Sequence, residues 1–273
     1  MNAQYIETNS IYSDFARQLF NNYNILQIPE KLNSCLIDLS SQYNINLNKS
    51  DNIRKLYNDL INKYYQNETI IKSNFLNNIL FNYSNNTTIF EFKLDTSRAD
   101  LCNFNKYSTA YEIKTDLDNF LRLNKQVNDY SEIFEEVYII CSKHNLSNIS
   151  KLVPIHCGIY TYSLTKNYKY KFKRERKALL ITNLNSKKQL SLLTTSELKS
   201  EFAKCKNSLR KKQMIDLILA SYSPKYINSK FKSVIKRRYN DKWTFLKQNY
   251  NKIYEIDYQW FFKNNIAPEI IYQ

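Results

Sequence analysis

The sequence contains a single glycine, Gly158, among its 273 residues. Loops that cradle nucleotide phosphates need several glycines, because the backbone must approach the phosphates closely. A P-loop and a dinucleotide-binding fingerprint are therefore both excluded. Chemistry driven by a bound nucleotide is not expected.

Cysteine and histidine patterns that bind zinc are also missing. The five cysteines are scattered without a C-x-x-C pair, and there are only two histidines. Structural zinc and a disulfide framework are therefore not expected. The N-terminus lacks the basic start and apolar run of a signal peptide, and no stretch reaches the roughly 18 apolar residues of a membrane helix. We expect a cytoplasmic protein with no membrane partner.

What the sequence does contain is a group of strand-like segments. Three short runs rich in β-branched and aromatic residues predict strands: TTIFEFK (87–93), ADLCNF (99–104) and TAYEIKT (109–115). A hairpin around Lys106 places Asp100 opposite Glu112, with both side chains on one face of the sheet. Lys114, two residues after Glu112, points to the same face.

Two carboxylates and an ammonium in the middle of an apolar sheet are what a divalent-metal site with an activating lysine requires. The alternative interpretation is simpler. Acidic and basic residues that alternate with apolar ones also form the solvent-exposed face of an antiparallel sheet. The residues that follow favour the first interpretation.

Residues 116–130 predict a helix in which Gln126 and Tyr130, four residues apart, share one face. The run EVYIICS (136–142) then predicts a buried strand, and so a βαβ crossover. Two further runs predict the remaining strands: HCGIYTYS (156–163) and YKYKFK (168–173).

These residues together resemble the PD-(D/E)XK nuclease superfamily, and most closely its RecB-like branch with a Q-x-x-x-Y helix. The residues that carry the resemblance are Asp100, Glu112, Ile113, Lys114, Gln126 and Tyr130. Ala99 stands where the motif has proline. The wider segment also resembles a mostly uncharacterised bacterial and phage family assigned to that superfamily, from residue 68 to about 163 and more faintly beyond.

The resemblance implies a restriction-endonuclease-like α/β core, a central mixed sheet flanked by helices. It implies that Asp100, Glu112 and the backbone carbonyl of Ile113 bind Mg²⁺ or Mn²⁺. Lys114 would then orient or deprotonate the attacking water. Gln126 and Tyr130 would contact the nucleic-acid backbone or brace the lysine.

A helix before the first core strand often supplies another glutamate in this superfamily, and Glu68 is the candidate. The alternative for Glu68 is a favourable charge in the first turn of a helix predicted over residues 68–83. We expect three parts in the chain: a helical lead-in (1–66), the nuclease-like core (67–164) and a basic helical region (165–273).

The basic region holds the excess positive charge of the chain. Residues 165–252 contain 24 Lys or Arg and five Asp or Glu, a formal +19, whereas the whole chain carries +15. Such a run is often only a solvated helix face. Beside a candidate phosphodiesterase site, attraction to a polyanion explains it better.

The function predicted is therefore that of a Mg²⁺- or Mn²⁺-dependent nuclease, acting on nucleic acid, with DNA favoured, and carried by a phage or mobile element. One alternative is a catalytically inactive nucleic-acid-binding or regulatory protein on the same fold. Another is a module whose basic helices meet an acidic protein. The sequence leaves open DNA against RNA, endo- against exonuclease action, and a homodimer or protein partner.

Overall fold

The computed structural model describes residues 3–47, 51–205 and 208–272. The helices are α1 (Ala3–Asn22), α2 (Pro29–Gln42), α3 (Ile53–Tyr64), α4 (Glu68–Asn78), α5 (Leu123–Ser131), α6 (Leu146–Leu152), α7 (Ser186–Ser191), α8 (Thr195–Glu201), α9 (Lys211–Ser221), α10 (Pro224–Asn249), α11 (Tyr258–Asn264) and α12 (Pro268–Ile271). The strands are β1 (Thr87–Lys93), β2 (Arg98–Phe104), β3 (Ser108–Lys114), β4 (Glu136–Ser142), β5 (Gly158–Leu164) and β6 (Tyr170–Arg176).

The described residues form two compact units, each built from segments that are distant in sequence. Unit 1 comprises those within 1–77, 164–170 and 245–273, and unit 2 those within 78–163 and 171–244. The division into three consecutive parts expected from the sequence stays a prediction. No helix among the described residues combines the length and the hydrophobicity needed to cross a membrane.

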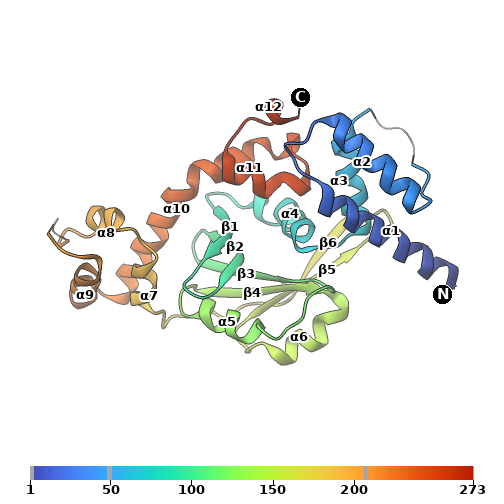
Figure 1. Ribbon diagram of the computed structural model, residues 1–273. Helices are drawn as coiled ribbons and strands as arrows, with labels where there is room; N and C mark the ends of the chain where they lie inside the picture. The colour runs from blue at the N-terminus through green and yellow to red at the C-terminus, as the bar shows by residue number, and fades with distance from the viewer. Residues whose placement is uncertain (1–2, 48–50, 206–207, 273) are drawn as a thin grey trace. The chain divides into compact units, whose positions relative to one another are not determined.

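Six strands form one mixed sheet in the order β1-β2-β3-β4-β5-β6. β1, β2 and β3 pair antiparallel, and β3, β4 and β5 pair parallel. The connections between the parallel strands carry α5 and α6, which lie together beside β4 (Figure 1). The predicted α/β class, a mixed sheet flanked by helices with helical N- and C-terminal regions, is confirmed.

The β2–β3 hairpin turns about Lys106, as predicted. Phe104 pairs with Ser108, and Leu101 pairs with Tyr111. One further step in the same register brings Asp100 opposite Glu112, so their side chains share a face of the sheet.

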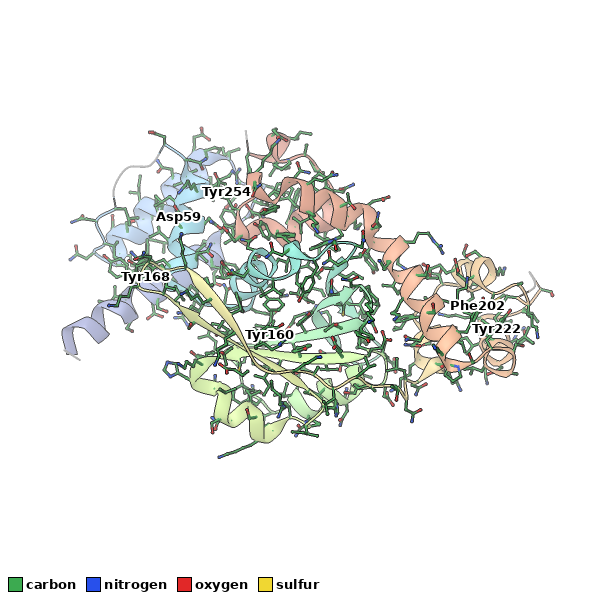
Figure 2. All side chains as sticks on the ribbon, turned by 180° about the vertical axis from the view of Figure 1, so that it is seen from behind. Asp59, Tyr160, Tyr168, Phe202, Tyr222 and Tyr254 are labelled. Carbon is green, nitrogen blue, oxygen red and sulfur yellow. The ribbon has the colours of Figure 1, made fainter. Side chains whose placement is uncertain are left out.

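Aromatic side chains cover the other face of the parallel strands. The rings of Tyr111 and Tyr138 are stacked with centroids 5.7 Å apart, and Tyr160 lies 5.2 Å from Tyr138 (Figure 2). Gly158 pairs with Tyr138 across β4 and β5. A Cβ atom at Gly158 would lie 2.1 Å from the Tyr138 ring, so only glycine leaves room for that ring.

The first part of α10 packs against the sheet within unit 2. Phe231 is fully buried, with its ring centroid 6.1 Å from that of Phe104 on β2. Lys232, the next residue, forms an ion pair of 2.8 Å with Glu135, the residue directly before β4. The basic helix is therefore held to the strands by a buried ring and a salt bridge.

Two predicted helices differ from the observed ones in their bounds. The helix predicted over 116–130 begins only at Leu123, because Asp118 accepts hydrogen bonds from the backbone and side chain of Thr115 and fixes a turn there. The helix predicted to run from Glu68 to Tyr83 ends at Asn78, and a short 3₁₀ turn follows. For α3, Asn52 provides the N-cap. The sequence alone predicts Ser50 as the cap of this helix, and Ser50 lies outside the described residues.

Candidate active site

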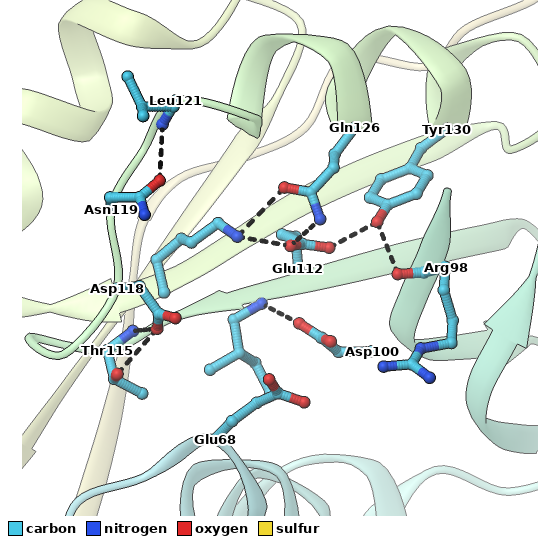
Figure 3. A network of polar contacts seen from close by, with 12 residues as sticks. Glu68, Arg98, Asp100, Glu112, Thr115, Asp118, Asn119, Leu121, Gln126 and Tyr130 are labelled. Atoms are coloured by element: carbon cyan, nitrogen blue, oxygen red, sulfur yellow. Dashed lines mark hydrogen bonds and ion pairs between the residues drawn. The ribbon is translucent and has the colours of Figure 1, made fainter. Parts of the chain in front are cut away.

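Asp100 lies on β2, and only 7% of its surface is exposed. Its Oδ2 accepts a hydrogen bond of 2.6 Å from the backbone N–H of Ile113 on β3 (Figure 3). In an extended strand the N–H and C=O of one residue point to the same side. The carbonyl of Ile113 is therefore also directed toward β2. This is the side of β3 on which Asp100 lies, so the orientation is consistent with the predicted role of this carbonyl as a metal ligand.

The Glu112 carboxylate, 2% exposed, is the centre of a polar network. Oε1 accepts a hydrogen bond of 2.7 Å from Lys114 Nζ and one of 2.5 Å from Gln126 Nε2. Oε2 lies 2.6 Å from the Tyr130 hydroxyl. The predicted strand residues and the predicted Gln-x-x-x-Tyr pair on α5 thus converge on one carboxylate (Figure 3).

Lys114 is 8% exposed and bridges two partners. Besides Glu112, its Nζ donates a hydrogen bond of 3.1 Å to Gln126 Oε1. Burial lowers the pKa of Lys114, but Glu112, and then Asp100, more than offset this, so the pKa lies above its usual value. The side chain is therefore an ammonium near neutral pH, suited to donating hydrogen bonds and stabilising negative charge.

Tyr130 ties α5 to the start of β2. Its hydroxyl is also 2.9 Å from the carbonyl oxygen of Arg98, two residues before Asp100. Burial, followed by the negative charge of Glu112, raises the pKa of Tyr130 far above its usual value. The phenol therefore stays protonated and acts as a donor, either to Glu112 or to the Arg98 carbonyl.

Glu68 begins α4 and belongs to unit 1. Its Oε1 lies 2.6 Å from Nζ of Lys72, one turn along the same helix, and its side chain is 45% exposed. An acidic residue in the first turn, paired to a lysine at i+4, stabilises a helix on its own account. A role for Glu68 in the chemistry stays a prediction.

The donor set in unit 2 fits a hard divalent cation. Asp100, Glu112 and the Ile113 carbonyl offer only oxygen atoms, which Mg²⁺ and Mn²⁺ prefer. Lys114 is the competing feature, because its ammonium already pairs with the Glu112 carboxylate. A bound cation and Lys114 therefore have to share the charge of Glu112.

The sequence did not point to Glu91 and Arg98. Glu91 interrupts the apolar run of β1 with a left-handed φ of 54° and forms an ion pair of 2.5 Å with Arg98. An isolated glutamate between Phe90 and Phe92 was the available signal. Asp116 and Asp118 lie in the turn after β3 and stabilise that turn. Asp116 accepts a hydrogen bond from the Ser142 hydroxyl, and Asp118 accepts one from the backbone N–H of Thr115.

Residues 62–259, well over half of the chain, match the family described as Bacteriophage P4 protein cII. Protein cII of Enterobacteria phage P4 is 35% identical over 102 residues, which cover 37% of this chain and 38% of that protein. The aligned part is thus well under half the length of this curated relative. A solved structure titled "SPO1766 protein of unknown function from Silicibacter pomeroyi" is 13% identical and covers 41% of this chain and 70% of that chain, with a TM-score of 0.32.

Proposed function

We propose that this chain, which belongs to the bacteriophage P4 protein cII family, is a divalent-metal-dependent nuclease that hydrolyses phosphodiester bonds in DNA. The single observation that carries the proposal is the convergence of Asp100, Glu112 and Lys114 on one face of the sheet. The resemblance of these residues to the PD-(D/E)XK nucleases supports it. The phage relative supports a role in phage or mobile-element DNA.

Asp100, Glu112 and the carbonyl of Ile113 would hold Mg²⁺ or Mn²⁺, whose positive charge would stabilise the transferring phosphoryl oxygens and acidify a bound water. Lys114, as an ammonium, would donate hydrogen bonds to the phosphate and orient the attacking water. Against the effect of burial, the negative charge of Glu112 raises the pKa of Lys114. Lys114 is therefore protonated while Glu112 is charged, and this disfavours proton abstraction from water by Lys114.

Gln126 and Tyr130 act through Glu112 and Lys114. The Gln126 amide donates to Glu112 through its nitrogen and accepts from Lys114 through its oxygen. It therefore fixes the distance between the carboxylate and the ammonium. Tyr130 holds the second Glu112 oxygen. Both residues position the groups that would meet the phosphate, since reactive groups must be held within fractions of an ångström.

The basic helices supply binding that is independent of base sequence. Exposed lysines on α9 and α10, such as Lys212 and Lys225, would neutralise DNA phosphates and release counterions. Part of the basic charge is used internally, because Glu197 and Glu201 form ion pairs with Arg238 and Arg237 on α10. The remainder favours a polyanionic partner.

The second candidate function is an inactive nucleic-acid-binding or regulatory protein on the same fold. The observation that favours it is the Glu112 carboxylate itself, which already accepts bonds from three side chains. Such a protein would bind DNA in EDTA and show no metal-dependent cleavage.

The test is incubation of the purified chain with plasmid, linear duplex and single-stranded DNA in Mg²⁺, Mn²⁺ or EDTA. We expect cleavage with either metal and none in EDTA. Lys114→Ala and Asp100→Asn should each lower the rate by at least about 100-fold, the usual loss for one stabilising or ligating group. Lys125→Ala, at an exposed ion-paired lysine on α5, is the matched control.

Two results would overturn the proposal. Cleavage that persists at the same rate in Lys114→Ala would assign the activity to a contaminant or another site. Absence of cleavage on every substrate, with DNA binding retained, would select the second candidate function.

A further inference from the structure

Arg98 is the first residue of β2 and lies two positions before Asp100. Residues i and i+2 of a strand share a face, so the Arg98 side chain leaves the sheet on the same side as the Asp100 carboxylate. Its side chain is 65% exposed, whereas Asp100 is nearly buried. Arg98 therefore lies at the solvent-exposed edge of the candidate active site, and Figure 3 shows it beside Asp100.

Glu91 holds the Arg98 guanidinium in this position. The carboxylate Oε2 lies 2.5 Å from Arg98 Nε, and the Glu91 side chain is only 11% exposed. The ion pair is made through the inner nitrogen of the guanidinium. The two terminal amino groups, which form the outward fork of an arginine, are thus left on the exposed end of the side chain.

The backbone at Glu91 is strained. The ladder between β1 and β2 pairs Phe90 with Leu101 and Phe92 with Ala99, and it skips Glu91. Glu91 has a φ of 54°, a conformation that costs a residue with a side chain about 1–2 kcal/mol. An exposed ion pair contributes at most about 1 kcal/mol. The salt bridge alone therefore gives little reason for the strain, which points to a positional role.

The register of β1 and β2 is the same on both sides of Glu91, so Glu91 lies opposite Asp100 and adds its charge to the site. A carboxylate oxygen of Glu91 lies within 4.8 Å of one of Asp100. Glu91, Asp100 and Glu112 bring three negative charges, against which Lys114 and Arg98 bring two positive ones. A DNA phosphate approaching this surface meets net repulsion unless a cation faces it, and Arg98 is the exposed cation of the set.

We propose that Arg98 binds a phosphate of the DNA strand beside the scissile bond, and that Glu91 positions its guanidinium for this contact. An arginine fork matches two phosphate oxygens, which a lysine ammonium does not. The inference deepens the proposed function and rests on it for the position of the scissile bond. Tyr130 connects Arg98 to the candidate active site, because its hydroxyl lies within hydrogen-bond distance of both the Arg98 carbonyl and the Glu112 carboxylate.

The test measures binding of a fluorescein-labelled duplex of 20 base pairs in EDTA at several KCl concentrations, so that no cleavage is involved. Loss of one phosphate contact lowers the slope of log K against log[KCl] by about 0.9. We expect this change for Arg98→Ala, together with weaker binding, and an unchanged slope for Arg98→Lys. Arg17→Ala, which removes an exposed arginine that also pairs with a carboxylate, is the matched control.

A second arm uses Glu91→Gln, which makes the chain more positive and on charge alone would tighten DNA binding and speed cleavage. The positioning role predicts the opposite for single-turnover cleavage, a several-fold loss that persists at saturating Mn²⁺. The inference is overturned if Arg98→Ala and Arg17→Ala have the same slope and affinity, or if no variant binds DNA. Absence of cleavage by the wild type with a normal Arg98 effect on binding would instead overturn the proposed nuclease activity alone.

Discussion

The Glu112 carboxylate is 2% exposed and accepts bonds from an ammonium, an amide and a phenol. A buried carboxylate with that number of partners is stable only while its positive partner remains. Lys114 is that partner, at 2.7 Å. The Lys114–Glu112 ion pair therefore affects both the stability of the fold and metal binding. Removing Lys114 leaves the Glu112 carboxylate without its positive partner, so that a metal ion could neutralise it instead.

The first prediction concerns Lys114→Met. Leaving Glu112 without its ammonium should lower the free energy of unfolding by about 3 kcal/mol, measured by urea denaturation in EDTA. Mn²⁺ should then stabilise Lys114→Met more than it stabilises the wild type, since a ligand of the native state contributes RT ln(1 + [L]/Kd). Equal losses in Lys114→Met and in Lys125→Met, at a lysine that is 60% exposed, would contradict this account.

Among the elements, strands were easier to predict from the sequence than helix ends. The predicted bounds of β1 and β4 agree with the observed ones, because alternating or continuous apolar runs flanked by polar turns are local signals. The start of α5 was not predictable in this way. Its position depends on the bonds from Thr115 to Asp118, which compete with helix formation.

The candidate site shows the same division between local and non-local information. Hairpin register was sufficient to predict that Asp100, Glu112 and Lys114 share one face of the sheet, and helical spacing that Gln126 and Tyr130 share one face of a helix. Only the family resemblance implied that the Gln-x-x-x-Tyr pair would lie beside the strand residues. The Glu91–Arg98 ion pair was not predicted, because it depends on a skipped ladder position and a left-handed φ. A backbone irregularity of this kind leaves no periodic pattern in the sequence.

The second prediction concerns the pairing of β4 with β5. Gly158→Ala should lower the free energy of unfolding by about 1–3 kcal/mol, because the new Cβ would lie 2.1 Å from the Tyr138 ring. The loss should shrink when Tyr138→Ala is also present, since the ring is then absent. Ser163→Ala, at an exposed position on β5, is the control. A cost that is unaffected by Tyr138→Ala would show that the ring is not the obstacle.

At the scale of the whole molecule, positive charge is concentrated in residues 165–252, with a formal +19 against +15 for the entire chain. The asymmetry predicts affinity for polyanions that depends steeply on salt. It also predicts that a lysine or arginine in the basic region contributes more to DNA affinity than one elsewhere on the chain, because counterion release needs contact with the phosphates.

The third prediction follows from that asymmetry. Lys212→Glu, on α9, should weaken duplex DNA binding several-fold and reduce the salt slope by at least about 0.9. Lys31→Glu, at an exposed lysine on α2 outside the basic region, makes the same change in net charge and should have a much smaller effect. Binding isotherms at four salt concentrations provide the comparison. Equal effects of the two variants would mean that only net charge matters.

Unit 1 joins distant segments around one buried acid. The Asp257 carboxylate accepts hydrogen bonds from the hydroxyls of Tyr23, at 2.9 Å, and Tyr272, at 2.7 Å. Burial raises the pKa of Asp257 to about 6, although both hydroxyls and Arg54 act in the opposite direction. The folded state therefore binds a proton more tightly here than the unfolded chain does.

The fourth prediction is the resulting pH dependence. With a folded pKa above the unfolded one, Asp257 lowers the free energy of unfolding as pH rises from about 4 to about 6, by on the order of 3 kcal/mol. Above that window the contribution is constant. The difference in stability between wild type and Asp257→Asn, from urea denaturation at each pH, should change across this window. A difference that stays constant from pH 4 to pH 7 would contradict the account.

The metal site at Asp100 and Glu112 is tested most directly by the anomalous scattering of Mn²⁺ in a crystal of the wild-type chain. We expect one strong peak within about 2.5 Å of carboxylate oxygens of both Asp100 and Glu112, and its loss in Asp100→Asn. A crystal that shows no peak at these residues at saturating Mn²⁺, with Lys114 still bound to Glu112, would contradict it.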